Sequence, residues 1–212
     1  SAVLTVNADF VNNTTASTLS KTGRGRAALK GANAYSGATS IAEGELAFGG
    51  SSTQTLAGVI SGAGSLVREG TGRLALTAAN TYTGPTLISG GMVLASNNAA
   101  LGSSAAGTFI SNGGTLDIGG SSSDQAMNLN AEQITVSGAG VNGRGAIING
   151  SARSQYNALR LVSLSGDTTF GGDASGARWD LRNVNGTSTL AMNGHTLTKV
   201  GSNLFGLTGV SV

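Results

Sequence analysis

The sequence predicts an all-β protein: a right-handed parallel β-helix, or β-solenoid, of nine or ten short coils in a single elongated unit. Three observations carry this prediction. A segment recurs after 47 residues, apolar and polar residues alternate in short bursts, and the 212 residues include 35 glycines but one proline. Repeats of this length stack into solenoids, because one unit alone cannot bury its apolar face. Alternating bursts between glycine-rich corners indicate short strands.

The composition favours a thin core over a globular one. Charged residues make up 10% of the chain and aromatic residues 4%, so small and β-branched side chains must fill the interior. The formal net charge of +2 is too small to indicate a nucleic-acid partner. The chain contains no cysteine, which means little in a cytosolic protein but would suit a secreted protein that is exported unfolded, where a premature disulfide would block passage.

The repeat occupies residues 19–46 and 66–93, and 13 of its 28 aligned positions are identical. We interpret one period as about two coils of three short strands each. Shared apolar positions predict the core of the stack, which includes Leu29, Ile41, Leu76 and Ile88. Shared glycine, asparagine and tyrosine positions predict its corners, which include Gly23, Asn33, Tyr35, Gly37, Gly70, Asn80, Tyr82 and Gly84.

The strands follow the alternation in chain order. In the second copy, residues 73–77 point Leu74 and Leu76 inward, and 86–89 and 92–95 follow after turns. Residues 124–132 could form a helical turn. The same alternation predicts later strands at 108–111, 115–118, 133–137, 146–148, 159–164, 178–181, 189–192 and 196–198.

A partial third copy occupies residues 197–209, where Lys199 and Gly201 stand in the places of Lys21 and Gly23. We therefore expect residues 1–212 to be one β-helical segment of a longer chain. A β-sandwich is the alternative fold, but it does not readily explain a two-coil repeat ending in Asn-x-Tyr-x-Gly.

Two motifs recur in the copies. The first copy has Lys21-Thr-Gly-Arg-Gly and Ala32-Asn-Ala-Tyr-Ser-Gly37, and the second has Gly70-Thr-Gly72 and Ala79-Asn-Thr-Tyr-Thr-Gly84. This pattern resembles the passenger-associated β-strand repeat of bacterial autotransporters. The resemblance implies a right-handed β-helical passenger, exported by the type V route through its own C-terminal outer-membrane barrel, which lies outside this chain. It also implies a place on the surface of a Gram-negative cell, or secretion from it.

The residues predict no catalytic centre, cofactor or metal. The one histidine, His195, lies in a turn sequence, and Gly-x-Ser-x-Gly does not occur, so a serine nucleophile is not predicted. Residues 138–143 match G-x-G-x-x-G, but a strand follows, whereas a phosphate site needs a helix N-terminus. Asp167, Asp173 and Asp180 could converge with Arg178 and Arg182, as carboxylates do in β-helical polysaccharide-cleaving enzymes, or they are isolated surface charges.

Arg26 and Arg73 are equivalent residues of the two copies. Stacked two coils apart, they could form a basic stripe that binds acidic glycans or lipopolysaccharide, or they lie on a solvated face. We expect a non-catalytic stalk that supports presentation and folding-coupled export. The alternatives are an adhesin that binds host glycan or neighbouring copies through a side face, and a polysaccharide-active β-helical enzyme.

Overall fold

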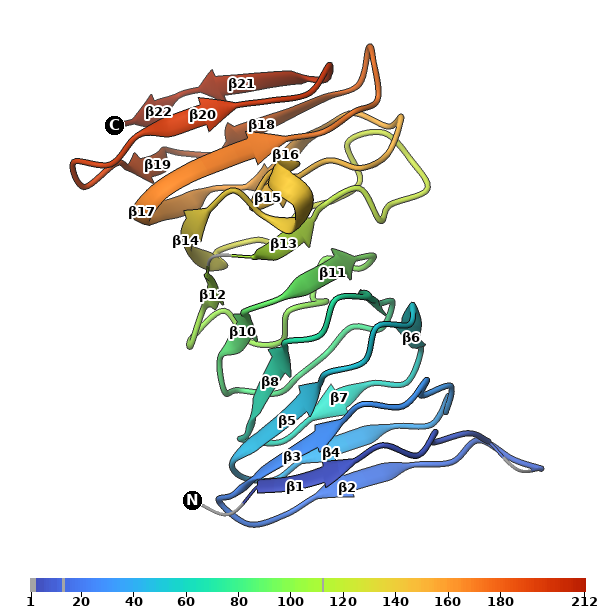
Figure 1. Cartoon of the computed structure of the whole chain (residues 1–212). Coiled ribbons are helices and arrows are strands. Elements are labelled where there is room, and N and C mark those ends of the chain that lie inside the picture. The colour runs from blue at the N-terminus through green and yellow to red at the C-terminus, as the bar shows by residue number, and fades with distance from the viewer. Residues whose placement is uncertain (1–2, 13, 112) are drawn as a thin grey trace.

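The computed structural model describes residues 3–12, 14–111 and 113–212, whose strands stack into one solenoid with the chain ends at opposite ends of the stack (Figure 1). All strand pairs are parallel (for example Arg26 with Glu45), so the predicted parallel β-solenoid is confirmed. Within the described ranges, the helical structure is a 3₁₀ turn, η1 (Val141–Gly143). No helix of this part of the chain has the length and apolarity needed to cross a membrane.

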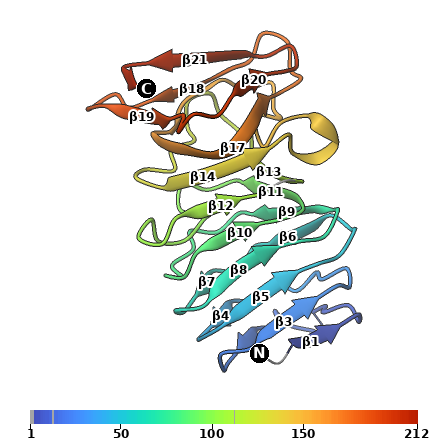
Figure 2. The ribbon, with the colours of Figure 1, turned by 60° about the vertical axis from the view of Figure 1, so that its left-hand side comes forward.

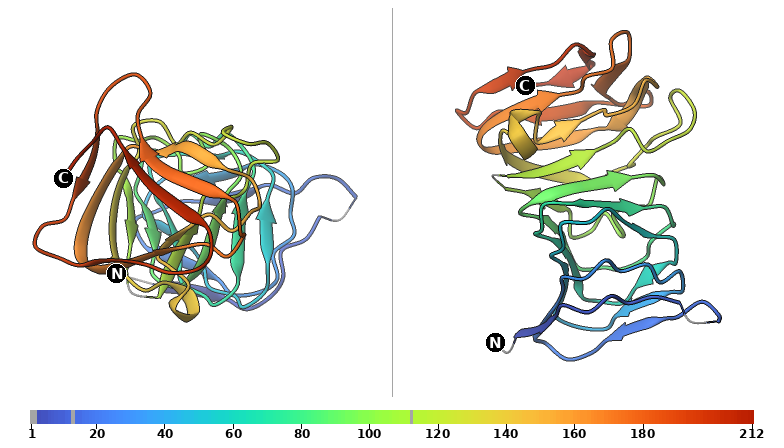
Figure 3. Two further views of the ribbon diagram at one scale, coloured as in Figure 1. Left: turned by 90° about the horizontal axis from the view of Figure 1, so that it is seen from above. Right: turned by 45° about the vertical axis from the view of Figure 1, so that its right-hand side comes forward.

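Each coil runs over three faces, which surround the interior when the stack is viewed from above (Figure 3). The first face is a continuous ladder that climbs the molecule (Figure 2). Its ten strands, joined by nine turns, are β1 (Val3–Val6), β3 (Arg26–Leu29), β5 (Glu45–Phe48), β8 (Ser65–Arg68), β10 (Thr86–Ile88), β12 (Thr108–Ile110), β14 (Gln133–Gly138), the first half of β17 (Leu161–Gly171), β19 (Ser188–Ala191) and β22 (Val210–Ser211).

The second face carries a shorter ladder. It comprises β6 (Gln54–Leu56), β9 (Arg73–Leu76), β11 (Gly91–Ala95), β13 (Gly114–Asp117), β15 (Ile147–Ile148), the second half of β17 and β20 (Leu197–Lys199).

The third face has two sheets of three strands with irregular backbone between them. Single backbone hydrogen bonds continue the stacking there, as from Thr81 N to Ile60 O and from Ser103 N to Tyr82 O. The strands are β2 (Leu19–Lys21), β4 (Thr39–Ile41), β7 (Ile60–Ser61), β16 (Gln155–Leu159), β18 (Arg178–Arg182) and β21 (Leu204–Thr208).

One continuous apolar cluster fills the interior. Leu29, Ile41, Leu76 and Ile88 all belong to it, and none is more than 2% exposed. Their inward direction follows from strand alternation, since neighbouring side chains point to opposite faces of a sheet. Towards the C-terminal coils, aromatic rings join the aliphatic core, where Phe170, Trp179 and Phe205 form a cluster of three mutually contacting rings.

The repeat advances by one face between its copies, a displacement that the interpretation of the period as about two coils did not include. In the first copy β3 lies on the first face, whereas its equivalent β9 lies on the second. Likewise β4 lies on the third face and its equivalent β10 on the first. Coils here contain 19 or 20 residues, as from Arg26 to Glu45 and from Glu45 to Ser65. A period of 47 residues therefore comprises two coils and about one third of the next coil.

Later coils are longer and less regular. From Gln133 to its partner Leu161 the chain takes 28 residues, and the additional residues lie in the corners. The strand expected at 159–164 is divided between β16 and β17. Residues 124–132 contain turns and no helix, which corrects the expected helical turn; Gln125 and Asn130 have positive φ there, a conformation that no α-helix contains.

Candidate functional site

The shared asparagines lie at coil corners and bind the backbone of neighbouring coils. Asn80 Oδ1 accepts a hydrogen bond from Ile60 N (2.8 Å) in the coil before it, and Asn80 Nδ2 donates to Ala100 O (2.6 Å) in the coil after it. Asn33 Oδ1 accepts from Phe10 N (3.1 Å). Buried backbone groups need such partners, so each asparagine replaces ladder hydrogen bonds where the strands stop.

The shared tyrosines are also internal. Tyr35 and Tyr82 are at most 3% exposed, and their hydroxyl groups meet those of Thr39 and Thr86. Burial raises the pKa of Tyr35 to about 12 and raises the pKa of Tyr82 as well. Both rings are therefore neutral packing elements near pH 7 and are not available to an external ligand.

The corner glycines allow neighbouring backbones to approach each other. A Cβ on Gly37 would stand 2.3 Å from Ser17 O, and one on Gly84 would stand 2.4 Å from Gly64 O. Gly70 has the same kind of contact with Gly50 O, whereas Gly23 lies in open space with φ of +73°, a conformation that favours glycine.

A buried cation closes the corner after a shared strand, a role that the sequence did not reveal. Lys21 Nζ donates to the backbone oxygens of Thr22 (2.9 Å) and Gly23 (2.6 Å). Its equivalent in the second copy is Arg68, which is 0% exposed and donates to Phe48 O (2.9 Å) and Gly50 O (2.7 Å). The lysine that begins the first motif, together with the arginine at the same place in the second copy, was the sequence feature that could have indicated this role.

Arg26 and Arg73 lie on different faces of the solenoid, which rules out the basic stripe that was one of the two alternatives for them. Arg26 forms ion pairs with Glu45 and Glu69 on the first face. It stands at the edge of a hollow of about 490 Å³ that Leu87 and Phe109 also line.

Arg73 lines a hollow of about 430 Å³ on the second face. One side of this hollow, here called the second-face hollow, comes from the corner before β9. The other side comes from the long corner between β14 and β15 and from the corner after β15. Its lining residues are Thr53, Thr71, Gly72, Arg73, Met92, Asp117, Val141, Arg144, Ile148 and Gly150.

The long corner between β14 and β15 folds back onto β13. It contains η1, the yellow helical turn that stands out at the right-hand edge of the stack in Figure 2. Thr115 holds both of its ends, because Thr115 Oγ1 accepts from Val141 N (2.9 Å) and donates to Gly145 O (2.9 Å). Arg144 Nε donates to Asp173 Oδ2 (2.8 Å). This corner is thus a fixed wall of the second-face hollow.

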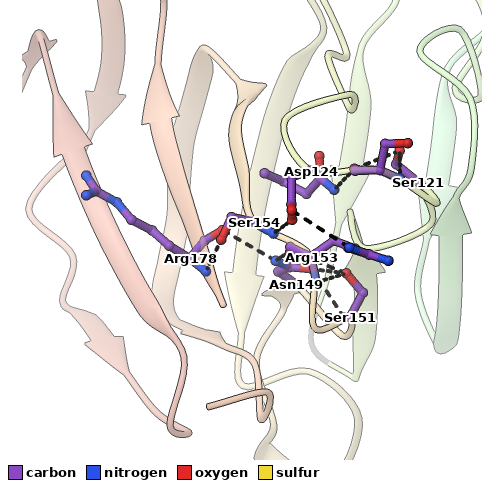
Figure 4. A network of polar contacts seen from close by, with 9 residues as sticks. Ser121, Asp124, Asn149, Ser151, Arg153, Ser154 and Arg178 are labelled. Atoms are coloured by element: carbon purple, nitrogen blue, oxygen red, sulfur yellow. Dashed lines mark hydrogen bonds and ion pairs between the residues drawn. The ribbon is translucent and has the colours of Figure 1, made fainter. Parts of the chain in front are cut away.

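A polar network fixes the corner after β15, which supplies Gly150 (Figure 4). Asn149 Nδ2 donates to Arg153 O (2.7 Å), and Asp124 Oδ1 accepts from Ser154 N (2.7 Å) in the next coil. Ser154 Oγ in turn accepts from Arg178 N (3.2 Å), while the Arg178 side chain extends away from the network. The network therefore joins three successive coils beside the hollow.

Asp117 is the buried ionisable group of the second-face hollow. Its Oδ1 accepts from Gly119 N (2.8 Å) and Gly150 N (2.9 Å). Burial raises the pKa of the carboxyl group, and the two hydrogen bonds and the charges of Arg73 and Arg144 oppose this rise.

A family model, described as the passenger-associated-transport-repeat, matches residues 19–48 and 66–95. In these two segments the chain is similar to the passenger-associated repeat. The resemblance seen in the sequence is thereby confirmed, and a β-solenoid with these repeats fits an autotransporter passenger domain. No curated protein and no solved structure matches the chain.

The passenger repeats lie away from the carboxylates considered for catalysis. Asp173 pairs with Arg144, Asp167 accepts from Thr196 N (2.9 Å), and Asp180 pairs with Arg178 on the third face. These three carboxylates do not converge. Over the described ranges, no three His, Cys, Asp or Glu residues gather as metal ligands.

His195 and the glycine pattern at 138–143 also lie outside the passenger repeats. His195 follows β19 in a turn closed by a hydrogen bond from His195 N to Met192 O (2.9 Å). Residues 138–143 run into η1 and on to β15, without the helix that a phosphate site requires.

Proposed function

We propose that this chain is a structural, non-catalytic passenger segment that holds another part of its parent protein away from the cell surface. The observation that carries the proposal is that the shared side chains lie inside the stack. Asn33, Asn80, Tyr35 and Tyr82 all make hydrogen bonds inside the stack. The shared asparagines bond neighbouring coils and the shared tyrosines pack within the core, which supports a role as a stable rod, since solenoid stability is a sum of terms within coils and between nearest neighbours.

The same bonding supports a role in export. Each coil contacts its neighbours, so a chain that emerges through an outer-membrane barrel of its own could add coils one at a time, and folding would oppose its return. We propose that the finished segment is displayed on the Gram-negative surface or released from it. The partner in this step is the C-terminal translocator of the parent protein.

The test places the 212-residue chain between a surface reporter and a type V translocator barrel. Ile88→Asp, which puts a charge into the core, should reduce the amount of reporter at the cell surface. Arg24→Gln, at an exposed ion pair with Glu43, is the matched control and should leave display unchanged. Equal display of all three chains would refute the link between folding and export.

A further inference from the structure

We propose that the second-face hollow is a carbohydrate-binding site, in which Asp117 and Arg73 together hold the hydroxyl groups of a hexose ring. The proposal goes beyond the stalk role, and it depends on neither export nor display. It begins from the placement of Asp117. Leu116 and Ile118 belong to the core, so strand alternation directs Asp117 outward, yet the residue is only 7% exposed.

The two carboxylate oxygens of Asp117 differ in their hydrogen bonding: Oδ1 accepts from the backbone, and Oδ2 remains able to accept from a ligand. Both of its hydrogen bonds, from Gly119 N and Gly150 N, end on Oδ1. Among the described residues no donor lies within hydrogen-bond distance of Oδ2, yet this oxygen is not shut off from solvent. A ligand hydroxyl that enters the hollow can therefore donate to Oδ2 in place of water.

The charges of the second-face hollow select the class of ligand. Arg144 is paired with Asp173, which leaves Arg73 and Asp117 as a cation and an anion that line one space. An anionic ligand would be attracted by Arg73 and repelled by Asp117, and a cationic ligand the reverse. A hydroxyl group both donates and accepts hydrogen bonds, so a ring with several hydroxyl groups can satisfy both side chains at once.

The remaining lining fits the rest of such a ring. Thr53 and Thr71 add exposed hydroxyl groups, while the partly exposed Met92 and Val141 add apolar surface for the C–H faces of a sugar. A volume of about 430 Å³ lies within the usual range for small-molecule sites, roughly 300–1,000 Å³. Because Thr115 already fixes the wall that carries Val141, little ordering cost accompanies binding.

The test measures binding of the 212-residue chain to a panel of neutral and acidic oligosaccharides, first on a glycan array and then by titration calorimetry with the strongest binder. Asp117→Asn keeps an acceptor for the two glycine N–H groups but replaces Oδ2 by a donor. Arg73→Gln removes the cation. Each should weaken binding by roughly tenfold or more, as expected for hydrogen bonds to charged groups, and Arg24→Gln should not.

Thr71→Trp supplies a second variant, because Thr71 is exposed and its replacement fills the hollow without touching the core. Loss of binding in Thr71→Trp, with an unchanged circular dichroism spectrum and unfolding midpoint, supports the site even if Asp117→Asn is poorly folded. Absence of binding to every glycan by the unaltered chain overturns the proposal. Binding of acidic glycans alone that survives Asp117→Asn also overturns it, since that pattern requires only a basic surface.

Discussion

Replacement of Asn80 by alanine should destabilise the solenoid much more than the same replacement at Asn33, although the two residues are equivalent in the repeat. Asn80→Ala removes the partners of Ile60 N and Ala100 O, and both of those residues are 0% exposed. A buried backbone group left without a partner costs about 1–3 kcal/mol, so the loss should be about 3 kcal/mol or more.

Asn33→Ala leaves fewer buried backbone groups without a hydrogen-bond partner. Its Nδ2 donates to Gly31 O, but that oxygen also accepts from Gln54 Nε2 (2.7 Å) and therefore keeps a partner. The other bond serves Phe10 N, whose residue is half-buried. We expect a loss of about 1 kcal/mol.

The comparison is made by urea unfolding of both variants, followed by far-UV circular dichroism. Hydrogen exchange on the native chains should show faster exchange around Ile60 in Asn80→Ala. A free energy of unfolding for Asn33→Ala that falls as far as that for Asn80→Ala would refute the reasoning. It would mean that the bonds to neighbouring coils do not set the contribution of these asparagines.

Three further predictions rest on other parts of the stack. Ile88→Asp should lower the free energy of unfolding by roughly 3 kcal/mol or more, because it buries a charge, whereas Leu87→Asp on the outer side of the same strand should cost about 1 kcal/mol or less; urea unfolding separates them. Arg68→Lys should be tolerated and Arg68→Met should not, since only lysine can still donate to the corner carbonyls, as measured by thermal unfolding. Burial raises the pKa of Glu132 from 4.5 to about 7, although the Thr108 hydroxyl donates to it. The folded chain therefore keeps a proton that the unfolded chain loses, so stability should fall as pH rises from about 4.5 to about 7, and Glu132→Gln should remove this fall in urea unfolding across that range.

The sequence was sufficient for the fold because its signal is local and repeated. Alternation of two in residues 73–77 and 86–89 gives strands, and recurrence of whole units gives the stack. The sequence was not sufficient to predict on which face of the solenoid each copy of the repeat begins. A period of 47 residues is compatible with two longer coils or with two shorter coils and one additional face. Only the register of β3 with β5 and β8 distinguishes these arrangements.

The second-face hollow was beyond prediction for a related reason. Arg73, Asp117 and Val141 come from different coils, and the lengths of the corners between them decide whether they meet. Those corners are irregular, and the one that carries Val141 is held by Thr115 at its two ends and by a hydrogen bond from Gly145 N to Ala139 O. Asp117 nevertheless lay in a predicted strand at an outward position. An acidic residue there, beside the corner glycines that follow, was a usable signal.

The advance of the repeat by one face limits what its shared residues can do. The corner cation demonstrates the advance, since Lys21 closes a corner after the third face, Arg68 after the first and Lys199 after the second. Equivalent residues of successive copies therefore point in different directions, and a given face would meet the same residue again only after three periods. A surface built from shared residues cannot be continuous along one side of the rod. Recognition by this segment therefore needs residues that are not repeated and the irregular corners, and in the second-face hollow the shared Arg73 stands beside Asp117 and Val141, which lie outside the two copies.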